Sequence, residues 1–276
     1  KEEYEDAARY LLALPSDKVY NQKTWKLKHI QIRDLILKNE YELAYELASN
    51  HFGSDSEIIS EGEWLAGWIA LNFLKDADTA LGHFQKFLEV VSYPISISRG
   101  SFWYAKALEN KNDFSNAKLW YEKAAAYPDN FYGQLAVMKL DGRIKNHLNQ
   151  YFGSHHPTET YNLYSNDLVR ASFYLSKSGE TEDAKNFILS AIRQAKDKEE
   201  ISKIVSIGYT IGRPELTVKA AKESVKKQVF VGTYAYPIPE YINSERVDRA
   251  LILGLARQES EFDKLALSYA GAMGLM

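Results

Sequence analysis

Apolar positions recur along the first part of the chain at a spacing of about 36 residues. In each repeat a leucine lies nine residues before an alanine, and another apolar or aromatic residue lies four residues after that alanine. This spacing is typical of two amphipathic helices joined by a short polar turn. A further copy follows after a gap of 67 residues. The repeat positions are Leu35, Leu71, Leu108 and Leu175, then Ala44, Ala80, Ala117 and Ala184, then Ala48, Phe84, Tyr121 and Ile188.

Each predicted helical pair has one apolar face, so it must stack on its neighbour to bury that face. The small alanines allow the two helices to approach closely. The sequence therefore predicts an all-α fold, an α-superhelix or solenoid of helical hairpins similar to tetratricopeptide repeats, without a sheet and curving into an open arc or ring. The polar turns are expected at Lys38, Lys75, Asn110 and Ser178.

The second part of the chain is divided by turns, a loop and a proline-containing linker. The interval 127–160 contains a turn near Pro128 and a loop, and two more helices are expected within 198–229, broken at 212–214. Pro237 and Pro239 favour an extended, non-helical linker over 234–239. We expect three domains: a superhelical repeat domain over 1–197, linking helices with the proline-containing linker over 198–240, and a further α domain that begins at 241 and ends, incomplete, at 276.

A helix capped by Ser244 is expected over 247–262. Its apolar stripe includes Leu251 and Leu255 and continues at Glu259. A carboxylate on an inward, apolar face would have a raised pKa and could donate a proton near neutral pH. The alternative is a glutamate that is paired with a buried arginine or that lies in water at the end of the helix.

Composition narrows the function classes. The chain has 276 residues and no cysteine, which excludes a disulfide framework and a thiol nucleophile. The net charge of −3 gives no basic excess, so no nucleic-acid partner is expected. The most apolar stretch, 64–74, is too short to span a membrane. His155 and His156 lack further ligands at suitable spacing, so we expect no metal and no cofactor.

Two segments resemble soluble lytic transglycosylases, which cleave peptidoglycan. The sequence ARQESEF at 256–262, followed by AGAMGLM at 270–276, is similar to the first catalytic motif of that family. The sequence NFYGQLA at 130–136 resembles a signature in its helical superstructure. The chain departs from the motif at Lys264, where the family usually has proline. The resemblance also implies that the last domain is lysozyme-like and truncated within its catalytic part.

This resemblance implies an activity and its residues. Glu259 would be the catalytic residue, and Ser268 and Met276 would bind substrate. The reaction would cleave the MurNAc-β-1,4-GlcNAc bond of peptidoglycan glycan strands without water, giving a 1,6-anhydromuramyl product, with Glu259 as the single general acid/base. The resemblance also implies the periplasm of a Gram-negative bacterium, and the chain shows no signal peptide at Lys1. We expect residues 1–276 alone to be inactive.

A second reading assigns no chemistry to the chain. It would be a non-enzymatic helical-repeat scaffold that binds a protein partner through the superhelix, and Glu259 distinguishes it from the enzyme. Among nearby acids, Asp263 would share a helix face with Glu259 and could not flank a substrate from the opposite side. Glu261 is expected to be solvated, and Arg257 to contact water or a backbone carbonyl. The repeat tryptophans are expected mainly in the core.

Overall fold

The chain is almost entirely helical, as the sequence predicts. The computed structural model describes residues 2–14, 18–51, 55–153, 162, 165–244 and 246–275. Over these residues there is no strand, and Leu267 and Met273 form a single isolated antiparallel bridge. The chain divides into two compact units, Lys1–Leu148 and Asn149–Met276, hereafter unit 1 and unit 2. The domain boundaries at 197 and 240 stay a prediction.

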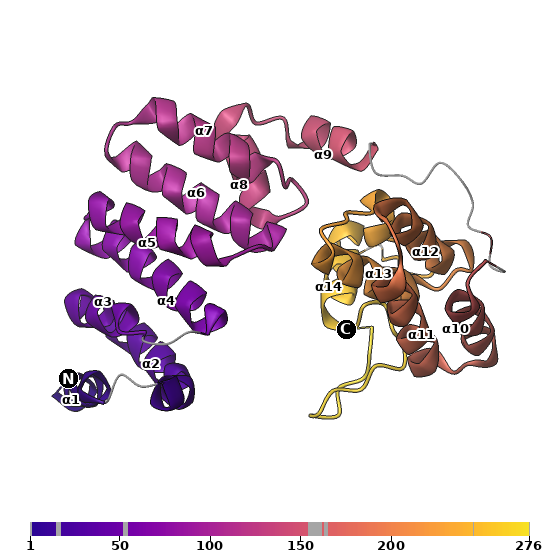
Figure 1. The fold of residues 1–276 in the computed structure, drawn as a ribbon, viewed down its shortest axis with the longest axis horizontal. Coiled ribbons are helices and arrows are strands. Elements are labelled where there is room, and N and C mark those ends of the chain that lie inside the picture. The colour runs from indigo at the N-terminus through magenta and orange to yellow at the C-terminus, as the bar shows by residue number, and fades with distance from the viewer. Residues whose placement is uncertain are drawn as a thin grey trace. The chain divides into compact units, whose positions relative to one another are not determined.

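Unit 1 is a stack of helical hairpins in chain order (Figure 1). Helices α2 and α3, α4 and α5, and α6 and α7 form the three pairs, and α8 packs on the last pair. Helix α9 crosses the division between the units. The elements are α1 Glu2–Ala13, α2 Lys18–Leu37, α3 Tyr41–Ser49, α4 Ser56–Ile69, the π-helix η1 Ala70–Leu74, α5 Ala77–Val90, α6 Pro94–Asn110, α7 Phe114–Ala125, α8 Phe131–Leu140 and α9 Ile144–Gly153.

The predicted repeat positions form the core of these hairpins. The repeat alanines Ala44, Ala80 and Ala117 are at most 1% exposed, and the repeat leucines of unit 1 are also buried. The turn between the paired helices has a left-handed residue in every repeat, at Asn39, Lys75 and Asn112. Such a residue ends a helix and turns the chain back on itself. The stacking of hairpins that the spacing predicts is thus confirmed within unit 1.

Helix α8 lies in the interval where the sequence predicts only a turn and a loop. It contains the NFYGQLA segment, whose small residues have packing reasons. A Cβ atom at Gly133 would lie 1.9 Å from the carbonyl oxygen of Tyr127, so only glycine lets α8 approach the end of α7. Ala136 is fully buried, and the ring of Tyr132 lies 5.5 Å from that of Phe102.

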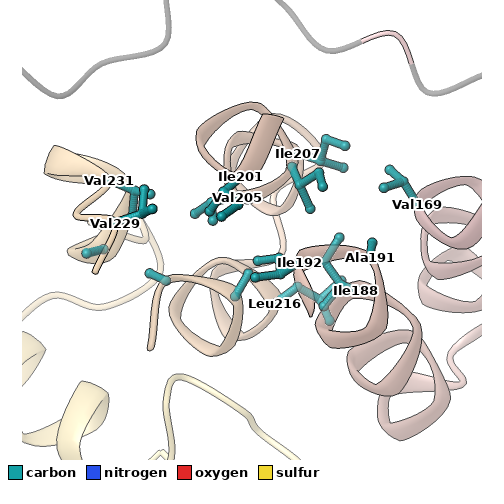
Figure 2. Close-up of a cluster of buried hydrophobic side chains, with 14 of the residues drawn as sticks. Val169, Ile188, Ala191, Ile192, Ile201, Val205, Ile207, Leu216, Val229 and Val231 are labelled. Carbon is teal, nitrogen blue, oxygen red and sulfur yellow. The ribbon is translucent and has the colours of Figure 1, made fainter. Parts of the chain in front are cut away.

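Unit 2 contains two further hairpins and a last helix. The break predicted at 212–214 is confirmed, with Gly212 at a φ of 70° between the two helices of the second hairpin. Figure 2 shows how side chains from helices α10 to α13 and from the following segment meet in one cluster, which includes Val169, Ile192, Val205, Leu216 and Val231. The elements are α10 Asp167–Ser178, α11 Thr181–Gln194, α12 Lys198–Thr210, α13 Pro214–Lys226, the 3₁₀ helix η3 Gly232–Ala235 and α14 Arg249–Glu259.

The predicted extended linker is partly wrong. Tyr234 and Ala235 belong to the 3₁₀ helix η3, and Ala235 is 6% exposed within the core cluster of unit 2. Proline restricts only itself and the residue before it, so Pro237 and Pro239 leave these positions free to turn. Within 234–239, residues 236–239 are without helical structure. The segment is therefore packed onto the hairpins.

Candidate active site

Helix α14 is shorter than the sequence predicts. It begins after Asp248, whose carboxylate accepts hydrogen bonds from the backbone N–H groups of Ala250 at 2.8 Å and Leu251 at 3.2 Å. Ser244, the predicted cap, instead accepts from the backbone N–H of Arg246, before the helix starts. The helix ends at Glu259 and does not continue to 262. An aspartate carboxylate is a strong N-cap, and it fixes the start four residues later than expected.

The buried face of α14 lies one residue further along the sequence than the predicted stripe. Ala256 and Ser260 are 1% and 7% exposed, whereas Leu251 and Leu255 are 56% and 43% exposed. Glu259 follows the leucines on the exposed face. The carboxylate therefore does not point inward, and the structure agrees with the alternative in which Glu259 lies in water at the end of the helix. Small side chains at 256 and 260 allow the close approach, and the larger leucines are left outside.

Two arginines hold α14 against the segment before it. Arg257 donates from Nε to the carbonyl oxygen of Ala235 at 2.9 Å, and its guanidinium lies 4.4 Å from the centre of the Tyr236 ring. Arg249 donates from Nε to the carbonyl oxygen of Ile242 at 3.1 Å. Of the two partners that the sequence predicts for Arg257, water or a backbone carbonyl, the structure shows the carbonyl. These bonds fix the rotation of the helix, and with it the direction of Glu259.

The chain makes a strained turn directly after Glu259. Glu261 and Phe262 have φ angles of 53° and 64°. Each left-handed residue other than glycine costs about 1–2 kcal/mol, so this turn needs compensating contacts. The backbone N–H of Phe262 donates to the carbonyl oxygen of Ala256, and that of Asp263 donates to Ser260 at 2.8 Å. Residues 260–263 are hereafter the Glu259 turn.

Glu261 is not solvated, contrary to prediction. Its carboxylate lies 2.7 Å from Nζ of Lys222 and 3.5 Å from Nζ of Lys219, both on α13. Burial alone would raise the pKa of Glu261, but the two ammonium groups hold it below its ordinary value. Phe262 follows and is 1% exposed, packed in a cluster with Val218. The left-handed turn, and not helical periodicity, buries this ring.

Asp263 is buried and paired with a lysine from a distant helix. It is 5% exposed, and its Oδ2 accepts from Nζ of Lys185, on α11, at 2.5 Å. Its Oδ1 accepts from the backbone N–H of Leu265 at 2.8 Å. Burial acts to raise the pKa of Asp263, but these bonds hold it below its ordinary range. Because the helix ends at Glu259, the two acids share no helix face.

The segment after the turn, yellow in Figure 1, runs out from the helices as a narrow loop and returns. Ser268 lies in this loop and is exposed; its Oγ accepts from the backbone N–H of Ala272 at 2.9 Å. Gly274 packs on the Glu259 turn, where a Cβ atom would lie 2.1 Å from the carbonyl oxygen of Asp263. The glycine of the GLM sequence is thus required by close packing. Met276 lies outside the described residues.

Of the three acids at 259, 261 and 263, Glu259 is the exposed one. Among the described residues, the Glu259 carboxylate has no hydrogen-bond or ion-pair partner, whereas Glu261 and Asp263 form ion pairs with lysines. His155 and His156 lie outside the described residues. Within the described part of the chain, no group of three potential ligands is placed to hold a metal ion. No helix there is long and apolar enough to cross a membrane.

The described part of unit 1 contains a strongly perturbed carboxylate that sequence reasoning missed. Glu63, on α4, is 5% exposed. It lies 3.1 Å from Nε2 of His51 and 2.6 Å from Nδ1 of His83, and the hydroxyl of Tyr45 lies 2.9 Å from Nε2 of His83. Nζ of Lys86 is 3.8 Å away. Burial acts to raise the pKa of Glu63, but the two histidines lower it to about 2.

The repeat tryptophans pack in the core clusters of unit 1, as predicted. Trp64 stacks on Trp68 at 6.1 Å between ring centres, and Tyr104 lies 4.3 Å from Trp120. These rings are half-buried and cover the hairpin cores from the side. Their role in this structure is packing between neighbouring hairpins.

Comparison with known proteins agrees with the motif. Residues 237–276 match the Transglycosylase SLT domain family. The inactive Glu-to-Gln mutant of lytic transglycosylase Slt from Pseudomonas aeruginosa has 19% sequence identity and a TM-score of 0.64, over 91% of this chain and 41% of its own. The 70 kDa soluble lytic transglycosylase of Escherichia coli has 14% identity and a TM-score of 0.53, over 99% of this chain and 48% of its own.

The chain thus spans less than half the length of either transglycosylase. A comparison with curated protein sequences gives no match. At these identities the two structures establish the fold, and the match over 237–276 establishes the family of the segment that contains Glu259. Residues 237–276 therefore carry a transglycosylase SLT domain sequence, on a chain with the fold of the soluble lytic transglycosylases, which confirms the resemblance seen in the sequence.

Proposed function

We propose that this protein is a peptidoglycan lytic transglycosylase in which Glu259 is the single general acid/base. The proposal rests on the ion pairing and exposure of the three acids at 259, 261 and 263. Lysines occupy the carboxylates of Glu261 and Asp263, whereas Glu259 is exposed at the end of α14, inside the segment that matches the transglycosylase family. The P. aeruginosa enzyme of similar fold is inactive as a Glu-to-Gln mutant.

The proposed reaction uses one carboxyl group twice. Glu259 first gives its proton to the oxygen between N-acetylmuramic acid and N-acetylglucosamine, and the bond from C1 to that oxygen breaks. The carboxylate then takes the proton of the muramyl C6 hydroxyl, whose oxygen bonds to C1 and closes a 1,6-anhydro ring. Glu259 ends as it began, and no water is consumed. The substrate's own N-acetyl group stabilises the positive charge at C1, so no second carboxylate is needed.

The surroundings of Glu259 suit a sugar chain laid along the helix. Leu251 and Leu255 are exposed beside it, and the nearby loop also exposes apolar side chains, with Tyr269 and Met273 among them. We assign Ser268 and Met276 to substrate binding, by the motif. A glycan strand over this face would exclude water from the acid and hold the sugar in reactive geometry. The corresponding location in the cell is the periplasm, where peptidoglycan lies.

The test is digestion of purified peptidoglycan sacculi by the intact protein, followed by mass spectrometry. A lytic transglycosylase releases muropeptides that lack one water at the muramyl end. Glu259→Gln should lower this release by about 10²- to 10⁴-fold, because the amide has the same shape but cannot give up a proton. Glu240→Gln is the matched control, since Glu240 is an exposed acid of the same segment, and it should retain full activity.

Residues 1–276 by themselves should release no anhydro product. Positioning of the substrate can supply about 7–11 kcal/mol of barrier reduction, and residues 1–276 span less than half the length of either transglycosylase of similar fold. An intact protein that remains active with Glu259→Gln would remove this residue from the mechanism. Absence of anhydro products from the intact protein would favour the scaffold reading.

A further inference from the structure

The Glu259 turn is held by residues that lie far upstream of the transglycosylase segment. Residues 237–276 match the family, whereas Lys185 is on α11 and Lys222 on α13. Both lysines reach the turn from the helical hairpins of unit 2. They contact the residues two and four positions after Glu259.

The turn needs such support because its backbone is strained. Glu261 and Phe262 are consecutive left-handed residues, and neither is glycine. Backbone of this kind persists only where the surroundings over-determine it. Three consecutive side chains anchor the turn. Glu261 pairs with Lys222, Phe262 is buried in the core, and Asp263 pairs with Lys185. Release of an anchor would let the chain relax and change the end of α14.

The two lysine contacts differ in strength. Lys185 and Asp263 are 9% and 5% exposed, so water and salt screen their interaction little. Lys222 has 41% of its side chain exposed, and its pair with Glu261 is more easily screened. Loss of the Lys185 ammonium would leave the buried Asp263 carboxylate without its directly bonded counter-charge, with only the weaker field of Arg213 remaining, which disfavours the present turn. Lys185 is therefore the main anchor.

We propose that Lys185 is a positioning residue for Glu259: through Asp263 it fixes the Glu259 turn and so the direction in which the acid leaves the helix. The inference rests on the proposed function of Glu259. It assigns the helical hairpin a part in the reaction, since α11 orients the acid as well as supporting the fold. Lys222, through its pair with Glu261, contributes less to the positioning of Glu259.

The first experiment measures the turn itself, without activity. In the full chain, NMR-detected hydrogen exchange should show protected backbone amides at Phe262 and Asp263. Lys185→Met should increase exchange of these two amides at least about tenfold, whereas Lys203→Met should leave them unchanged. Lys203 is the matched control because it pairs with Glu199 on α12, away from the turn. Unchanged exchange in Lys185→Met would overturn the proposal.

The second experiment measures the consequence for catalysis in the intact protein. A displacement of about 1 Å can lower a rate about 10²-fold. Lys185→Met should therefore lower kcat by about 10- to 100-fold with little change in KM, and Lys185→Arg should recover most of it. A kcat within about twofold of the unmodified protein would overturn the proposal.

A double variant separates positioning from stability. Lys185→Met with Asp263→Asn removes the unpaired buried charge, so the unfolding midpoint should recover, but kcat should stay low because the tie to α11 is absent. Recovery of kcat together with stability would show a merely structural role and overturn the proposal. If Glu259→Gln were fully active, the proposed function would fail, and the exchange experiment would still report whether Lys185 holds the turn.

Discussion

Replacing Glu63 with glutamine should destabilise unit 1 by about 3 kcal/mol at neutral pH. The carboxylate is buried on α4, and the hydrogen bonds from His51 and His83 overcome the opposing effect of burial. Its pKa falls from the ordinary 4.5 to about 2. Each unit of difference between folded and unfolded states corresponds to about 1.4 kcal/mol, and the shift is therefore worth about 3 kcal/mol.

The pH dependence follows from the direction of the shift. A carboxyl whose pKa is lowered by folding stabilises the native state fully above its unfolded pKa, and the contribution is lost as pH falls toward the folded value. The difference in unfolding free energy between the unmodified protein and Glu63→Gln should thus be larger above pH 4.5 than below it. It should decline below pH 4.5 and be roughly half as large at pH 3.

Tryptophan fluorescence measures unit 1 selectively. The chain has five tryptophans, and all lie before residue 149: Trp25, Trp64, Trp68, Trp103 and Trp120. Urea unfolding at several pH values, followed by this signal, gives the free energies directly. Glu122→Gln is the matched control, since its pair with Lys118 is exposed, and it should change stability by less than about 0.5 kcal/mol. A Glu63→Gln effect below about 1 kcal/mol at pH 7, or one independent of pH, would refute the reasoning.

Four substitutions test packing elsewhere, by the same unfolding experiments with circular dichroism added for unit 2. Gly133→Ala should lower the stability of unit 1 by about 1–3 kcal/mol because its Cβ atom would overlap the Tyr127 carbonyl oxygen. Gly82→Ala is the control: Gly82 lies within a helix with open space around it, so alanine should raise the stability by up to about 1 kcal/mol. Equal effects of the two substitutions would refute the packing argument. Phe262→Ala should lower the stability of unit 2 by about 3–5 kcal/mol because the ring is fully buried; a loss below about 1 kcal/mol would contradict this. Leu251→Ser should change stability by less than about 0.5 kcal/mol because the side chain is exposed, and a larger loss would show that its face is covered.

The repeat architecture could be predicted because it is local. The alanine of each hairpin lies nine residues after the leucine with which it shares a turn, and burial of both follows from helical geometry alone. The first hairpin of unit 2 shows the same logic, with Ala184 and Ile188 in its core. The motif around Glu259 was also recognisable, since its residues are contiguous. Helix α8 was missed because its apolar positions do not follow the repeat.

The orientation of Glu259 was decided only by tertiary structure. Periodicity predicts which residues share a face of α14, but it cannot tell which face packs on the hairpins, and the choice fell on Ala256 in place of Leu255. The partners of the turn lie far away in the sequence: Lys185 is 78 residues from Asp263, and Lys222 is 39 residues from Glu261. Sequence patterns within one element carry no information about such pairs. The sequence by itself thus determined the helical hairpins and the identity of the acid, whereas the packing of distant helices decided where the helix ends and which way that acid faces.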